Sequence, residues 1–82
     1  MNDYEFIDES NGRLDRYIAA GDDNELQAAA IEMYHYVLVE SRKLDTMDTE
    51  WAEKKRLLAN LLNRILREGF HFKEEEIENV LE

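Results

Sequence analysis

The chain has 82 residues, which is enough for one core, and we expect residues 1–82 to form a single helical domain. Twenty acidic residues against ten basic ones give a net charge of −10, which opposes direct binding to nucleic acid or to an anionic membrane. The absence of cysteine excludes disulfides and thiolate chemistry, and three glycines with no proline favour long helices joined by short turns.

The first predicted helix spans residues 3–20. Its apolar side chains recur at helical spacing on one face, at Tyr4, Ile7, Leu14, Tyr17 and Ile18. Asn2 or Asp3 is placed to cap its start, and Gly21 stands where a left-handed residue commonly ends a helix. Such a helix buries one face and leaves the other to solvent.

Asn11-Gly12 interrupts this pattern with a dipeptide that is typical of turns. The sequence therefore leaves two alternatives open. Residues 3–20 form one helix, or residues 3–10 form a short helix or arm that precedes a helix over 13–20.

The second predicted helix, from Asp22 to about Lys43, is the centre of the fold. Asp22 caps its start, and Glu25 follows three residues later in a capping-box arrangement. Its apolar residues occupy two adjacent lines, Leu26, Ala30, Met33, Val37 and Leu44 on one and Ile31, Tyr34 and Leu38 on the other, with Tyr36 on the flank. A helix with so wide an apolar sector needs cover on more than one side, from neighbouring helices or from another copy of the chain.

Met33 to Val39 is also rich in aromatic and β-branched residues, which favour strands. We nevertheless reject a strand here. The preceding AAAIEM run is strongly helical, no turn residue lies inside the segment, and the chain has no second strand candidate to pair with.

Residues 44–49, LDTMDT, are the predicted loop before a third helix. Asp48 or Thr49 is expected to cap that helix. Its core face is predicted from Trp51, Leu58, Leu62 and Ile65, widened by Leu57, Leu61 and Leu66. We expect the helix to end at Gly69 in a left-handed conformation, with Phe70 folding back on Ile65.

A short helix is predicted to close the chain, with Ile77, Val80 and Leu81 at helical spacing. Because so short a helix frays in isolation, we expect it to be stable only if Phe70, Phe72 and Leu81 dock on the core. The predicted fold is therefore all-α, a small antiparallel helical bundle of three long helices plus a short C-terminal helix.

The sequence offers little for catalysis or metal binding. His35 and His71 are the only histidines, and the Glu32-x-x-His35 motif occurs once, whereas a di-metal bundle needs it on two helices. The acidic loop does not follow the order of a calcium-binding loop, and there is no glycine-rich phosphate loop or Ser-His-Asp motif. We therefore expect no metal, no cofactor and no enzymatic activity.

Acidic residues are concentrated in two stretches. Residues 22–41 carry five acids and no base, and residues 74–82 carry another five acids and no base. If the two stretches adjoin, they form a negative patch that can meet a basic groove as nucleic acid does. The predicted patch consists of Asp22, Asp23, Glu25, Glu32, Glu40, Glu74, Glu75, Glu76 and Glu78. The alternative is that the surplus acid serves only solubility.

Apolar surface on the second and third helices exceeds what one short helix can cover. The candidates for self-association are Tyr34, Tyr36, Val39, Met47 and Trp51, of which tyrosine, tryptophan and methionine are enriched at interfaces. One outcome is a symmetric homodimer through these two helices. The other is a monomer in which the first and last helices cover both sides.

These features predict a non-catalytic acidic protein that binds and occludes a basic protein surface. Small phage-type inhibitors of nucleic-acid enzymes, which mimic nucleic acid, and immunity proteins share this profile of size and charge, by analogy alone. A second hypothesis is a homo-oligomeric structural or adaptor protein that assembles through the second and third helices. A third is a small-ligand binder with a pocket between protomers, lined by Tyr34, Tyr36 and a basic side chain.

The acidic start of the chain and the lack of a long apolar run lead us to expect no signal peptide, no membrane span and a cytoplasmic location.

Overall fold

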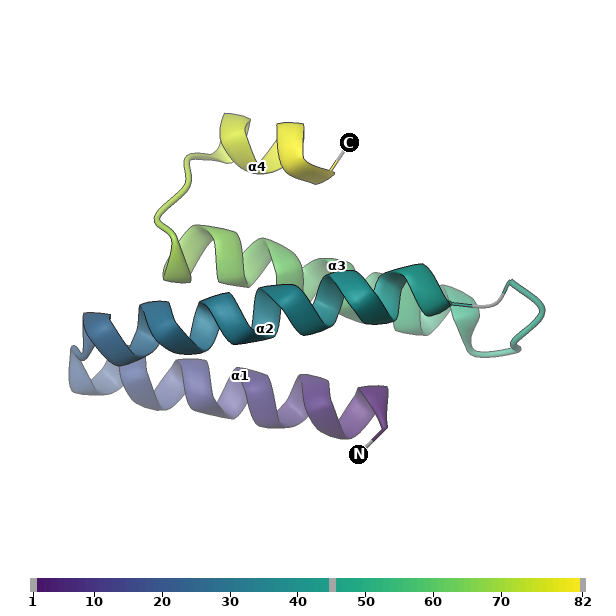
Figure 1. The fold of residues 1–82 in the computed structure, drawn as a ribbon, viewed down its shortest axis with the longest axis horizontal. Coiled ribbons are helices and arrows are strands. Elements are labelled where there is room, and N and C mark those ends of the chain that lie inside the picture. Colours follow the sequence, from purple (N-terminus) through teal and green to yellow (C-terminus); the bar gives the residue numbers. More distant parts are fainter. Residues whose placement is uncertain (1, 45, 82) are drawn as a thin grey trace.

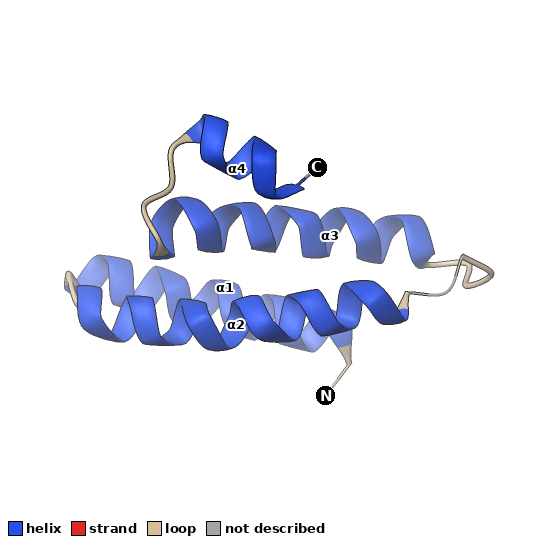
Figure 2. Cartoon of the chain, turned by 45° about the horizontal axis from the view of Figure 1, so that its top comes forward, coloured by secondary structure: helices blue, strands red, loops and turns tan. Residues whose placement is uncertain are grey.

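The structure is a computed structural model that describes residues 2–44 and 46–81. Every regular element in this part of the chain is a helix (Figures 1 and 2), which confirms the all-α prediction. The elements are α1 (Asp3–Ala20), α2 (Asp23–Lys43), α3 (Trp51–Arg64), a π-helical turn η1 (Ile65–Gly69) that continues α3, and α4 (Glu74–Leu81). Residues 33–39 lie inside α2, so the rejected strand does not form.

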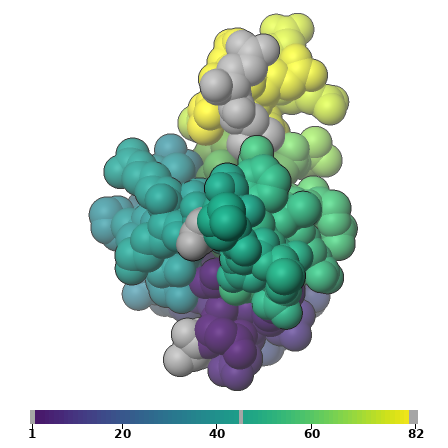
Figure 3. Space-filling model, turned by 90° about the vertical axis from the view of Figure 1, so that its right-hand side faces the viewer, coloured from purple at the N-terminus to yellow at the C-terminus, as the bar shows by residue number. Residues whose placement is uncertain are grey.

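The chain reverses direction at each of the three connections between helices (Figure 1). α1, α2 and α3 contact one another in pairs, and α4 packs against η1. Viewed from one end, the start of α1 lies on the side of the molecule opposite α4, with α2 and α3 between them (Figure 3). None of the described helices is both long enough and apolar enough to cross a membrane.

The buried apolar side chains form one cluster to which each helix contributes. Its members are Ile7, Leu14, Leu26, Ala29, Ala30, Met33, Val37, Leu58, Leu61, Leu62, Ile65, Leu66 and Ile77. The first apolar line of α2 is therefore buried, except that Leu44 at its end is half-buried. Within one chain the second line lacks full cover, because Ile31 is 57% exposed. The sequence left open whether neighbouring helices or another copy of the chain cover both lines, and at Ile31 the described part of one chain does not complete that cover.

α1 is one continuous helix, so the alternative of a separate arm over residues 3–10 is wrong. The side-chain amide of Asn11 donates to the carbonyl of Ile7 at 3.1 Å, and Arg64 Nη1 donates to Asn11 Oδ1 at 2.8 Å. Both of these hydrogen bonds hold Asn11 in the helical register. The turn tendency of Asn11-Gly12 is thus overridden by a contact with a residue far away in the sequence.

The predicted caps of the first two helices are confirmed. Asn2 Oδ1 accepts from the backbone N–H of Glu5 at 2.9 Å, and Asp22 Oδ1 accepts from that of Glu25 at 3.2 Å. Gly21 ends α1 in the left-handed region, with φ 67°. These bonds satisfy backbone donors that a helix leaves free at its start.

The start of α3 differs from the prediction. The helix begins at Trp51, so the residue at the cap position is Glu50, and its side chain makes no capping bond. Asp48 instead accepts the Glu50 N–H at 2.8 Å through its carboxylate and the Trp51 N–H at 3.1 Å through its carbonyl. The predicted cap at Asp48 or Thr49 is therefore wrong in position, because Asp48 forms a turn just ahead of the helix.

The end of this helix also differs from the prediction, because Gly69 lies inside the π-helical turn and is not left-handed. The left-handed residue is His71, with φ 57°. The Phe72 N–H donates to the Leu66 carbonyl at 2.9 Å, six residues back, which is one residue more than the long bond of a Schellman motif spans. The chain therefore leaves the helix through a wider turn, two residues later than expected. Phe70 does turn back at backbone level, donating to the Ile65 carbonyl at 3.2 Å.

Gly69 has a different role. A Cβ at this position would lie 2.4 Å from the Cβ of Ala30, so the glycine lets η1 approach α2 closely. α4 then docks through Ile77, which is 1% exposed, and Phe70 and Phe72 pack against the core as expected. The side chain of Leu81 lies outside the described part of the structure.

Candidate partner-binding surface

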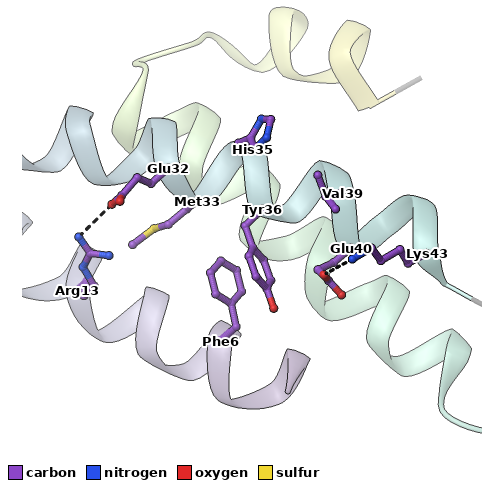
Figure 4. Close-up of a pocket in the computed structure, with 9 residues that line it drawn as sticks. All are labelled: Phe6, Arg13, Glu32, Met33, His35, Tyr36, Val39, Glu40 and Lys43. Atoms are coloured by element: carbon purple, nitrogen blue, oxygen red, sulfur yellow. Dashed lines mark ion pairs between the residues drawn. The ribbon is translucent and has the colours of Figure 1, made fainter. Parts of the chain in front are cut away.

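A groove of about 510 Å³ runs between α1 and α2 (Figure 4). Its apolar lining comes from Phe6 on α1 and from Met33, Tyr36 and Val39 on α2. The rings of Phe6 and Tyr36 are stacked, with centroids 3.7 Å apart and planes 24° apart. On α2 these residues recur every three residues, which places them on one face of the helix.

An ion pair lies towards each end of this apolar lining (Figure 4). Arg13 reaches across from α1 to Glu32 at 3.6 Å, and Lys43 pairs with Glu40 on the same helix at 3.6 Å. The Glu32 and Lys43 side chains are 73% and 67% exposed. Their partners are less exposed, Arg13 at 32% and Glu40 at 19%. Because one member of each pair lies in water, solvent screens both pairs and their contribution to stability is modest.

The electrostatic field at the groove is negative around Tyr36. Burial is the main cause that raises the pKa of the Tyr36 phenol, and the nearby carboxylates of Glu40 and Asp3 raise it further. Both carboxylates therefore lie close enough to the ring hydroxyl to disfavour its ionised form. The same field favours a cationic group from outside.

The predicted acidic patch is divided among three places. Asp22, Asp23 and Glu25 are exposed at the start of α2, and Glu32 and Glu40 line the groove. The remaining acids, Glu74, Glu75, Glu76 and Glu78, are exposed on α4.

A shallow pocket of about 310 Å³ lies between the start of α2 and the end of η1. It is lined by Asp23, Arg67 and His71, among others. Arg67 also reaches Glu74 at 3.9 Å. Arg67 thus pairs with an acid of α4 and lines the same pocket as Asp23 of α2.

Several basic side chains pair with carboxylates in the part of the chain that the structure describes. The pairs involve Arg13, Lys43, Lys54, Arg64 and Arg67. The most connected is Arg64, which donates to Asp15 on α1 and to Glu68 at 2.6 Å. Lys55 lies over the Trp51 ring, 5.0 Å from its centroid. Internal pairing therefore occupies basic groups and leaves the surplus acids facing solvent.

The residues predicted for self-association do not share one surface. Tyr34 packs edge-on against Phe70, with ring centroids 5.9 Å apart, whereas Tyr36 stacks on Phe6. Val39 lines the α1–α2 groove, and Met47 is 86% exposed in the loop before α3. Trp51 lines another groove of about 280 Å³ between α2 and α3, together with Leu44 and Leu62.

The described residues give no arrangement for metal chemistry. No three histidine, aspartate or glutamate side chains in this part of the chain lie close enough together to hold a metal ion. Glu32 turns to Arg13, and His35 points to the side of α2 away from Phe6 (Figure 4). The single Glu32-x-x-His35 motif therefore has no geometric support as a metal site.

Sequence reasoning missed Phe6, Arg13 and Met33 as lining residues of the groove. Phe6, Glu9 and Arg13 follow one another at three- and four-residue spacing, so they share one face of α1. That spacing is a readable signal, but it does not reveal which face of α2 they meet. Comparison with protein-family models, with curated proteins and with solved structures finds no match to this chain.

Proposed function

We propose that the protein is a non-catalytic binding module, a small antiparallel bundle of three long helices plus a short one, that occupies a basic surface of another protein. The observation that carries the proposal is the distribution of charge. Within the described residues, Arg13, Lys43, Lys54, Arg64 and Arg67 pair with carboxylates, and the acids of the α1–α2 turn and of α4 remain exposed. Such a surface attracts cationic partners over distances of about 10 Å.

The location of the acids also supports this proposal. Asp23 and Glu25 stand at the start of α2, where the positive pole of the helix dipole favours carboxylates even without a partner. Glu75 and Glu76 occupy the same position on α4. Both groups are held in place by regular backbone, so no ordering of a loop opposes binding.

The test starts with affinity capture from an extract of the native host at low and at moderate salt, followed by purification of the captured protein. Its association rate is then measured with the chain and with the variant Asp23→Asn/Glu25→Gln/Glu75→Gln/Glu78→Gln. We expect the rate to fall about tenfold, because opposite charges steer the encounter.

A matched control compares the association rates of two double variants. Asp23→Asn/Glu25→Gln changes the start of α2, and Asp8→Asn/Glu53→Gln is its control. Both double variants remove two exposed carboxylates. The pair at the start of α2 should slow association more than the control pair does. Equal slowing by both, or none by either, would count against a specific acidic surface.

A second candidate is a homo-oligomeric structural or adaptor protein that assembles through α2 and α3. The groove lined by Leu44, Trp51 and Leu62 favours it, because it leaves apolar surface on these two helices. Sedimentation at micromolar concentration tests this candidate. A species of twice the 9.8 kDa chain mass supports it, and a monomer removes it.

A further inference from the structure

We infer that α4 is a hinged strap that opens from the bundle as a unit while α1, α2 and α3 stay folded. The closed form is the major one, and repulsion between like charges on the strap and on the bundle sets how often it opens. This inference goes beyond the proposed function, because the motion needs no partner and is measured on the chain alone. In the space-filling view α4 stands out from the rest of the molecule (Figure 3).

One buried side chain holds α4 to the bundle. Ile77 is 1% exposed and belongs to the core cluster, whereas the other side chains that the structure describes on this helix are exposed. Among the described residues, one ion pair joins α4 to the bundle, between Arg67 and Glu74 at 3.9 Å. Both of its side chains are more than half exposed, so water screens the pair. Loss of the Ile77 contact is therefore enough to release the strap.

The hydrogen bonds place the hinge between Phe72 and Lys73. The Phe72 N–H donates to the Leu66 carbonyl and the ring packs against the core, so this residue belongs to the bundle. The Lys73 N–H donates to Glu76 Oε1 at 3.2 Å, and the Lys73 carbonyl accepts from the Ile77 N–H at 3.0 Å. Lys73 therefore belongs to α4. Rotation between these two residues swings the strap away and leaves both sets of hydrogen bonds intact.

Charge opposes closure of the strap. Residues 73–82 carry five acids and one base, a net charge of −4, and residues 1–72 carry fifteen acids and nine bases, a net charge of −6. Closure brings these two negative bodies together, at a cost in free energy that salt reduces by screening. Salt also weakens the pair between Arg67 and Glu74, but that is one attraction against many repulsions. Added salt should therefore lower the population of the open form.

Hydrogen exchange of backbone amides, followed by nuclear magnetic resonance at increasing urea, measures the opening directly. A released helix of eight residues is unstable, so opening frees its amides to exchange. We expect the amides of Ile77 to Val80 to exchange at least about a hundredfold faster than that of Val37 in the core, with one small urea dependence in common. They should still exchange at least about tenfold slower than in an unfolded peptide, because the closed form is the major one.

Two matched variants identify the anchor. Ile77→Ala should bring the α4 amides close to the exchange rate of an unfolded peptide. Val80→Ala trims a 41% exposed side chain of the same helix and should change the rate less than about threefold. Alanine favours the helix at both positions, so lost protection reports the lost contact. The amide resonances of α1, α2 and α3 should keep their positions away from the contact, which verifies that the bundle stays folded.

Salt and one further variant test the charge argument. Between about 0.05 M and about 0.5 M salt, exchange of the α4 amides should slow at least about threefold relative to an unfolded peptide at the same salt. Glu78→Gln should slow it about twofold at the lower salt. Glu78 is chosen because it lies beyond the first turn of α4, where carboxylates also stabilise the helix through its dipole.

Three results would overturn the inference. In the first, α4 and Val37 exchange at the same rate with the same urea dependence, so the strap opens only when the whole chain unfolds. In the second, the α4 amides have no protection, so the strap is never closed. In the third, their protection is graded along the helix and survives Ile77→Ala, which indicates fraying from one end. Exchange that responds neither to salt nor to Glu78→Gln would overturn the control of opening by charge.

Discussion

His71 is the one residue other than glycine with a left-handed backbone within the described ranges 2–44 and 46–81. A side chain in that region costs about 1–2 kcal/mol, and histidine has no backbone advantage there over glycine. His71→Gly should therefore stabilise the fold by about 0.5–1 kcal/mol, after the greater freedom of glycine in the unfolded chain is deducted. Urea unfolding measures the change.

The comparison for this prediction is Gly21→Ala. Gly21 occupies the same backbone region at the end of α1, with φ 67°, and a Cβ there meets no atom within 4 Å. Alanine at this position should cost about 1 kcal/mol through backbone strain alone. Destabilisation by His71→Gly would show that its side chain contributes more than the strain removes.

Tyr36 offers a pH test at the same scale. Burial and the carboxylates of Glu40 and Asp3 raise the pKa of its phenol. The folded chain thus holds this proton at a pH where the unfolded chain has lost it, and the free energy of unfolding falls as pH rises above about 10.

The difference between the absorbance titrations of the parent chain and Tyr36→Phe isolates this phenol. Glu40→Gln should lower its pKa while leaving it above the ordinary tyrosine value, because burial persists. A phenol that titrates at or below the ordinary value would contradict the packing of Tyr36 against Phe6.

At the scale of elements, the contact between Gly69 of η1 and Ala30 of α2 determines how closely the two helices pack. Gly69→Ala should cost about 1–3 kcal/mol, since the new methyl group lies against a methyl group fixed to the backbone. Ala30→Gly alone should cost about 1 kcal/mol through lost helix propensity. Urea unfolding of both single variants and the double variant measures their coupling.

Relief of the clash should make the double variant at least about 1 kcal/mol more stable than the sum of the single costs implies. Strict additivity would mean that the helices separate easily at this point. Additivity would therefore contradict the explanation that position 69 needs a glycine for close packing against Ala30.

The element boundaries that depend on neighbouring residues were predictable from the sequence. The caps at Asn2 and Asp22 and the end of α1 at Gly21 follow from local hydrogen bonds and backbone freedom. The end of η1 was not predictable from the sequence, because Gly69 is required for close packing against Ala30, which is distant in the sequence. The continuity of α1 through Asn11 likewise depends on Arg64.

The candidate site was predictable only in part, for the same reason. Glu32, Glu40, Tyr36 and Val39 were singled out by residue type and spacing, but they were assigned to two different surfaces. The structure brings them to one groove because Phe6 stacks on Tyr36. A contact between two helices that both carry aromatic residues cannot be placed from periodicity alone.

At the scale of the whole molecule, the surplus of acid is the feature that the proposed function depends on. The net charge of −10 resides on a scaffold in which several bases of the described residues are already paired with carboxylates. The exposed carboxylates repel one another across the surface, so a cationic partner relieves that repulsion when it binds. Binding and salt sensitivity are therefore two consequences of the same charge distribution.

The most direct measurement is the association rate of the captured partner as a function of ionic strength, by stopped-flow fluorescence of Trp51. Between about 0.05 M and about 0.5 M salt the rate should fall at least tenfold, because screening shortens the reach of the carboxylates. The dissociation rate should change much less. An association rate that stays constant over this range would contradict the account.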